Sequence, residues 1–229
     1  MKQFFLVKIL LFVTSLGFSQ VGINTTNPTK DLDINGELRI RNLPVQTGDF
    51  LLGADHDGNI GKTSVFLISD INSIAASQNV DITISPNQAK TLDNIDLGLS
   101  LPVTIPANRE AMVIISYSVP MGLSTFSSPR GYYGIRFLRD GTEAEVGSRK
   151  HTVMDRPNNS NMVSVSNIYT EKFASSPIER IINYTLNGYI EHFSSDISNT
   201  YRFNMWSPDP LVHNYNWGKA VISKQVYLK

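Results

Sequence analysis

Short runs of alternating apolar and polar residues dominate the chain from residue 80 onward. Val80–Ile84 and residues 132–139 (YYGIRFLR) alternate, and residues 111–119 (AMVIISYSV) form the strongest apolar run. A period of two residues is typical of β-strands that bury one face. Further strands are expected at residues 99–105, 142–153, 162–169, 178–190, 200–205 and 220–228. Because Pro102 cannot donate a hydrogen bond to a neighbouring strand, the first of these is an expected edge or irregular strand.

Turn residues separate these runs, and no alternation of strands with helices is visible. Ser, Asn, Gly and Pro punctuate the region from residue 80 to residue 229. Many short strands divided by turns indicate an antiparallel β-sandwich of the jelly-roll type. A Rossmann or TIM-barrel fold, which needs βαβ units, is disfavoured. The predicted fold class is therefore mainly β.

A tight hairpin is expected near residue 35. Asn35-Gly36 lies between residues 32–34 (LDI) and the alternating run 37–41 (ELRIR). Asn-Gly between two such runs is the sequence signal of a type I′ turn.

A second hairpin is expected at residues 49–65. The turn 57–59 (DGN) separates its two arms, residues 49–54 and 60–65. Asp55 and the polar residues of the turn also resemble the start of a calcium loop. The twelfth position of such a loop is a bidentate glutamate, and Phe66 stands there in this chain. We therefore interpret the segment as a turn.

Residues 65–76 (VFLISDINSIAA) are the best helical candidate. Ser69 or Asp70 could cap a helix in which Ile71 and Ile74 share a face. We expect a short connector helix, or alternatively a short helix between subunits. The composition changes near residues 77–79 (SQN), which predicts a hairpin stalk module at residues 21–76 and a jelly-roll head at residues 80–229.

The first twenty residues have the three parts of a secretory signal. Lys2 and Lys8 supply positive charge, an apolar stretch follows Lys2, and Ser19-Gln20 is the expected cleavage edge. The apolar stretch is shorter than the roughly 20 residues that a membrane-spanning helix needs. A buried first helix of the mature fold is the alternative. We expect residues 1–20 to be a signal peptide, the protein to be secreted or held at the cell surface, and the mature chain to have no membrane span.

Composition excludes several kinds of partner and chemistry. The chain has 20 basic and 20 acidic residues, with no cluster of either sign, whereas a nucleic-acid groove needs a basic field. It has no cysteine, which excludes disulfides, thiolate metal sites and cysteine nucleophiles. Stability must therefore come from the core or from partner subunits.

The segment that follows the expected signal resembles a recurrent motif. Residues 21–28 (VGINTTNP), 32–36 (LDING) and 39–40 (RI) follow the pattern V-G-I-G-T-x-x-P-x-x-x-L-D-V-x-G-x-x-R-I, with Asn24 and Ile34 as departures. The pattern is similar to that of exported phage tail-fibre-like proteins of the Bacteroidetes type. The resemblance implies an elongated, often trimeric β-rich shaft. Small hairpins bury too little surface to fold alone, and association would cover their edges.

Two segments of the expected head are similar to strands in jelly-roll heads of tail fibres and of C1q/TNF-like domains. These are residues 131–142 (GYYGIRFLRDGT) and 217–222 (WGKAVI). The resemblance implies a homotrimer that presents ligands on loops or on its outer flank. A likeness of fold does not assign a function, which has to come from a site.

The sequence shows no motif for catalysis, a metal or a cofactor. The four histidines, His56, His151, His192 and His213, are not at metal-ligand spacing, so we expect no metal and no cofactor. The patterns HExxH and G-x-S-x-G and a phosphate-binding loop are absent from the sequence. Glu179 could form a glycosidase pair with Glu191 only if the fold brought them together.

Residues 205–217 (MWSPDPLVHNYNW) carry two tryptophans, a tyrosine and a histidine between two expected strands. Aromatic side chains in a loop can stack on sugar rings or anchor a protein partner, so Trp206, His213 and Tyr215 are the binding candidates. The alternative is that Trp217 fills the core while Trp206 covers one end of the sandwich. Residues 155–161 (DRPNNSN) are a second candidate contact loop.

The sequence thus predicts a non-enzymatic, exported, fibre-like or adhesin-like protein. A homotrimer would bind a surface ligand, such as a glycan or a surface protein, through several weak sites at once. The alternatives are a carbohydrate-active hydrolase on the same scaffold and a structural subunit of a surface or tail-like assembly without a ligand.

Overall fold

The computed structural model describes residues 20–38, 51–63, 65–125, 130–153 and 161–229 of the chain. The chain divides into two compact units, residues 1–48 and residues 49–229, and each is described by itself. Apart from Gln20, the predicted signal peptide lies outside the described residues.

The first unit contains a parallel pair of strands instead of the expected hairpin. β1 (Val21–Ile23) pairs in parallel with β2 (Leu32–Ile34). The prediction of a hairpin between residues 32–34 and 37–41 is wrong for the part that is described, because the Asn35 amide donates back to the Ile23 carbonyl at 3.0 Å. Asn24, with φ 59°, turns the chain after β1, and its side chain donates to the Asn35 carbonyl at 2.9 Å. Asparagine tolerates this left-handed conformation, in place of the motif's glycine.

The second predicted hairpin is confirmed. β3 (Leu51–Ala54) pairs antiparallel with β4 (Ile60–Thr63). One oxygen of the Asp55 carboxylate accepts hydrogen bonds from the amides of Asp57 at 3.0 Å and Asn59 at 2.8 Å. These hydrogen bonds from backbone amides to the Asp55 side chain hold the turn.

The predicted connector helix at residues 65–76 is wrong. The segment forms β5 (Leu67–Ala75), which pairs antiparallel with β15 (Val221–Leu228). The isoleucine spacing fits a short helix, but β-branched residues favour strands, and pairing with β15 packs Ile74 against the core. Since β5 belongs to the head, the predicted boundary at residues 77–79 is only the turn between two strands of the sandwich.

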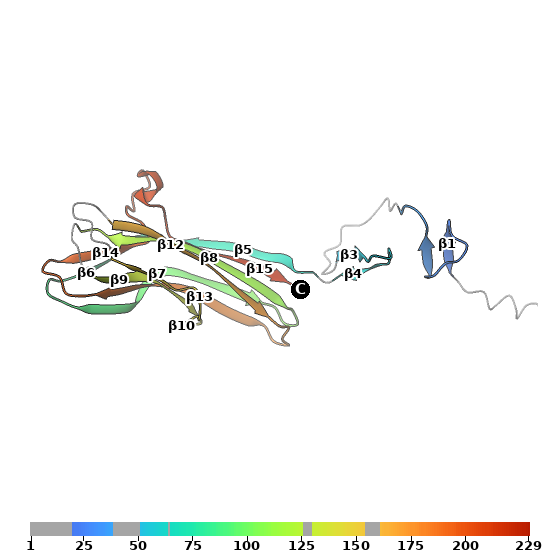
Figure 1. Cartoon of the computed structure of the whole chain (residues 1–229), viewed down its shortest axis with the longest axis horizontal. Coiled ribbons are helices and arrows are strands. Elements are labelled where there is room, and N and C mark those ends of the chain that lie inside the picture. Colours follow the sequence, from blue (N-terminus) through green and yellow to red (C-terminus); the bar gives the residue numbers. More distant parts are fainter. Residues whose placement is uncertain (1–19, 39–50, 64, 126–129, 154–160) are drawn as a thin grey trace, which may run out of the picture. The chain divides into compact units, whose positions relative to one another are not determined.

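Two antiparallel sheets pack face to face in the second unit (Figure 1). The first sheet contains, besides β5 and β15, the strands β6 (Val80–Ile84), β8 (Ala111–Leu123), β12 (Asn161–Phe173) and β14 (Asn199–Phe203). The second sheet contains β7 (Lys90–Ile105), β9 (Gly131–Arg139), β10 (Thr142–Glu143), β11 (Arg149–Thr152) and β13 (Arg180–His192). From β7 to β15 the long strands alternate between the sheets, so the head is an antiparallel jelly-roll sandwich, as predicted.

Pro102 lies on an edge strand, as its lack of an amide hydrogen requires. Among the strands that the structure describes, β7 pairs with β13 alone and ends the second sheet. The Pro102 carbonyl accepts a hydrogen bond from the Lys224 ammonium of β15 at 2.8 Å, and the same ammonium pairs with Asp70 of β5 at 2.6 Å. A lysine on the inner face of one sheet thus reaches the edge of the other.

The core fills the space between the sheets. Its largest fully buried side chains include Tyr133, Tyr184, Tyr201, Phe137 and Phe203. Each large buried apolar side chain contributes about 1.5–3 kcal/mol to stability. Burial raises the pKa of Tyr133 to about 12, so this phenol stays neutral at physiological pH.

Candidate functional site: the Ω-loop between β14 and β15

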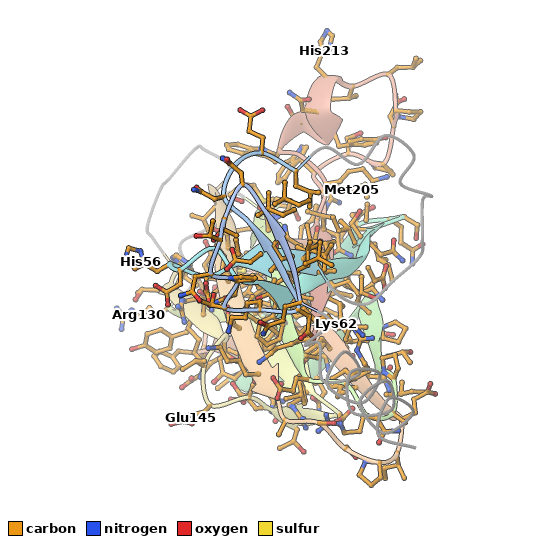
Figure 2. All side chains as sticks on the ribbon, turned by 90° about the vertical axis from the view of Figure 1, so that its right-hand side faces the viewer. His56, Lys62, Arg130, Glu145, Met205 and His213 are labelled. Carbon is orange, nitrogen blue, oxygen red and sulfur yellow. The ribbon has the colours of Figure 1, made fainter. Side chains whose placement is uncertain are left out.

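Residues 205–219 form a compact loop whose ends meet, here called the Ω-loop. The Asn204 amide donates to the Pro120 carbonyl at 3.0 Å, and the Ala220 amide donates to the Asn204 carbonyl at 2.7 Å. Met205 is buried and anchors the first residue in the core. Figure 2 shows Met205 at the base of the loop and His213 at its outer end. Compact loops with closed ends are frequently functional.

Tyr215 ties the middle of the Ω-loop to the sandwich. Its half-buried ring packs against the hydrophobic core. Its carbonyl accepts from the Ser207 amide at 3.1 Å, and its amide donates to the Val212 carbonyl at 3.0 Å. The Lys219 ammonium lies 4.7 Å from the centroid of the Tyr215 ring, which is the geometry of a cation–π contact.

Three consecutive residues of the Ω-loop are left-handed. Asn214, Tyr215 and Asn216 have φ values of 52°, 52° and 71° within the short 3₁₀ turn η1 (His213–Asn216). Asparagine adopts this region readily, but for a bulky tyrosine it is an outlier that costs about 1–3 kcal/mol. Strain of this kind persists where surrounding contacts enforce it, and it clusters at functional sites.

A pocket of about 540 Å³ opens on the Ω-loop. Its lining consists of Pro210, Leu211, Val212, His213, Asn214, Tyr215, Gly218 and Lys219. The lining contains an ammonium group, an imidazole, an amide and a phenol but no carboxylate. Leu211, in this lining, is 89% exposed. Such a lining can accept a polar or anionic group beside an apolar surface.

Trp206 lies outside the pocket lining and is held by Arg202 of β14. The guanidinium carbon lies 5.2 Å from the centroid of the indole ring, and Arg202 donates to the Trp206 carbonyl at 2.6 Å. Asp81 fixes the arginine through two hydrogen bonds of 2.6 Å. The bonds to Asp81 raise the pKa of the Arg202 guanidinium, which keeps it charged.

The structure therefore brings two of the three predicted binding residues together. His213 and Tyr215 share the pocket, whereas Trp206 is partly buried at the base of the loop. The alternative expectation that Trp217 fills the core is wrong, because Trp217 is about half exposed and Ala220 takes the buried position at the start of β15. The second candidate loop, residues 155–161, lies outside the described residues except for the backbone of Asn161.

Lys219 and Arg202 are residues of the candidate site that sequence reasoning did not single out. Each lies over an aromatic ring of the Ω-loop, and Arg202 belongs to a strand. A basic residue directly after the aromatic run was the available signal for Lys219. Nothing in the local pattern distinguishes Arg202 from another solvated strand residue.

The suggested carboxylate pair of Glu179 and Glu191 does not form. Glu179 precedes β13 and Glu191 lies near its other end, which separates them by about 40 Å at about 3.3 Å per residue. Glycosidases place their two carboxyl groups about 5–10 Å apart. Glu191 instead accepts a hydrogen bond from the Tyr189 hydroxyl at 2.6 Å.

His192 is a core residue. Its Nδ1 lies 2.9 Å from the Tyr201 hydroxyl, and its Nε2 is buried without a hydrogen-bond partner. Burial lowers the pKa of this imidazole. Within the described ranges, no three His, Asp or Glu side chains are grouped so that they could hold a metal ion, and no helix is long and apolar enough to span a membrane.

No protein-family model and no curated protein matches the chain. Among solved structures, it is similar to a chain of infectious bursal disease virus, Gx strain, at 9% identity with a TM-score of 0.33, over 81% of this chain and 46% of that chain. A second is the T13 particle of the same virus, at 9% identity and a TM-score of 0.27, over 78% and 43%. A chain of heated Israeli acute paralysis virus follows at 11% identity and a TM-score of 0.21, over 93% and 91%. This chain spans less than half the length of the two bursal disease virus chains. Structural similarity at these TM-scores says nothing about function. The functional proposal therefore rests on the candidate site.

Proposed function

We propose that this chain is a non-enzymatic, exported recognition subunit whose jelly-roll head binds a surface glycan through the Ω-loop. The observation that carries the proposal is the strained Tyr215, which is held left-handed over the core with Lys219 against its ring. A loop that its surroundings hold in one strained conformation is pre-organised for a ligand. Pre-organisation reduces the conformational entropy that is lost on binding.

The charge of the pocket favours an acidic glycan, one that carries a carboxylate or a sulfate. Lys219 is in the lining together with His213, and no carboxylate is. Among the described residues Lys219 forms no ion pair, so its ammonium is available to a ligand anion. An apolar rim at Leu211 would cover the carbon face of a sugar ring.

Several copies of a weak site bind more tightly than one copy. The resemblance of residues 21–40 to fibre-like proteins supports an assembly, and we propose a homotrimer with adhesin-like display of three Ω-loops. Linked sites raise overall binding by orders of magnitude when they can engage one surface together. The predicted secretory signal supports placement of this assembly outside the cell.

A glycan array and a glycosidase panel test the proposal on the same purified chain. We expect binding to acidic glycans without release of reducing sugar. Lys219→Gln should weaken that binding about tenfold or more, since a hydrogen bond to a charged group contributes about 1.5–3 kcal/mol. Lys150→Gln is the matched control, because Lys150 also lies over a tyrosine ring, at 3.8 Å from the Tyr189 centroid, but on the second sheet.

Turnover of a glycan would contradict the proposal and support a hydrolase. Equal binding by the Lys219→Gln and Lys150→Gln variants would show that the Ω-loop is not the site. Absence of binding to glycans and to surface proteins would favour the structural subunit without a ligand.

A further inference from the structure

The outer faces of the two sheets differ in charge. On the second sheet, Arg136 pairs with Glu143 at 2.9 Å, and Lys150 lies over Tyr189, which donates to Glu191. This is the charged, internally bonded surface expected of a sheet that faces water.

The outer face of the first sheet is different over β12, β8, β15 and β5, and we call this part the Ile/Ser face; the ion pair of Arg202 and Asp81 lies on β14 and β6 of the same sheet. Strand register aligns four rows across β12, β8, β15 and β5. The rows are Ser166, Ser118, Val221 and Ala75; Ile168, Ser116, Ser223 and Ser73; Thr170, Ile114, Gln225 and Ile71; and Lys172, Met112, Tyr227 and Ile68. Lys172, at one corner, is the only charged side chain among these sixteen positions.

Large apolar side chains on this face remain exposed to water. Ile68, Ile71 and Ile168 are 58%, 64% and 68% exposed, on the two outermost of the four strands. Single exposed isoleucines are ordinary, but a contiguous and nearly uncharged sheet face is typical of an interaction surface. The face is seen edge-on in Figure 1 along β12, β8, β15 and β5.

We infer that the Ile/Ser face docks onto the same face of a second copy of this chain. A charged partner would find almost no complementary charge there, whereas two copies of the face bring together only isoleucine, serine and similar neutral groups. The whole chain has 20 basic and 20 acidic residues, so two copies do not repel one another at long range. Contact between identical faces gives a two-fold interface, which would pair two copies of the proposed trimer rather than form the trimer itself.

The size of the face is sufficient for this contact. Four strands about 4.8 Å apart and about eight residues long, at about 3.3 Å per residue, make a flat area of about 500 Å². Two such faces bury about 1,000 Å², the lower limit for a specific interface, before the relief of the side chains is counted.

Pairing through the free edge of β5 is disfavoured, which favours contact through its face. β5 has a register shift opposite Val226 and Tyr227, and its Asp70 pairs with the inward-pointing Lys224. Bulges and inward-pointing charges are the devices by which edge strands avoid pairing with another chain. The inference does not depend on the ligand of the Ω-loop.

Sedimentation velocity over a concentration series tests the contact with the purified chain. Ile71→Glu and Ile168→Glu should each weaken association about tenfold or more, because the contact would bury an unpaired carboxylate. Ile181→Glu is the matched control: Ile181 is 60% exposed, but it lies on the second sheet. This variant should associate like the unmodified chain, and all three variants should keep the circular dichroism spectrum of the folded chain.

A thiol probe distinguishes a second copy from a segment of the same chain as the occupant. The chain has no cysteine, so Ser73→Cys introduces a single thiol on β5, in the second of the four rows. We expect slow labelling at concentrations where the chain associates and fast labelling on dilution. A monomer or trimer that does not pair further, pairing that persists in both isoleucine variants, or protection that does not change with concentration would each overturn the inference.

Discussion

The Lys224 ammonium donates to the Pro102 carbonyl at 2.8 Å and joins the two sheets of the sandwich at their edge. Lys224→Ala removes this bond and leaves the Asp70 carboxylate without its partner at 2.6 Å. We expect the free energy of unfolding to fall by about 1–3 kcal/mol. Urea unfolding followed by circular dichroism measures the change. Lys90→Ala, at an exposed lysine on β7, is the control and should stay within about 0.5 kcal/mol of the unmodified chain.

The alternation of apolar and polar residues predicted the strands that have one buried and one exposed face. Residues 111–119 and Val80–Ile84 are strands because their apolar positions face the core at every second residue. The first half of β7, residues 90–98, was not among the expected strands, since its apolar residues do not alternate strictly. Pairing with β13, which includes two irregularities of register, makes it a strand.

The errors come from long-range contacts that a local pattern does not contain. The isoleucines of β5 fit a helix until β15, about 150 residues later, supplies their hydrogen bonds. Asn35-Gly36 predicted a hairpin turn, but the Asn35 amide donates a hydrogen bond to the Ile23 carbonyl instead. In the Ω-loop, composition identified the aromatic residues, but the positions of Lys219 and Arg202 over their rings depend on the folded chain.

His192 should make the stability of the head depend on pH. Burial lowers the pKa of its imidazole below the 6.5 of an unfolded chain. The unfolded chain therefore binds more protons just below pH 6.5, so stability is full above that pH and is lost as the pH falls through the lowered pKa. Urea unfolding at several pH values between neutral and acidic measures this slope. His192→Gln should flatten it, whereas His213→Gln, at the exposed end of the Ω-loop, should leave it unchanged.

Gly134 lets β11 approach β9. A Cβ atom at this position would clash with the Arg149 carbonyl oxygen and crowd the Lys150 Cα. Gly134→Ala should displace β11 and lower the free energy of unfolding by about 1–3 kcal/mol, as expected when extra atoms enter a packed region. Gly61→Ala in β4 is the control, since a Cβ atom there meets nothing within 4 Å. Equal stability of the two variants would show that the approach of β11 is not a constraint.

Both tryptophans of the chain, Trp206 and Trp217, lie in the Ω-loop that carries the pocket, so intrinsic tryptophan fluorescence reports on this loop. Titration with an acidic oligosaccharide that binds on the array should give a saturable change in this fluorescence. The change should require about tenfold more ligand in Lys219→Gln and should be unaltered in Lys150→Gln. A ligand whose tryptophan signal responds at the same concentration in Lys219→Gln as in Lys150→Gln would contradict recognition through the Ω-loop.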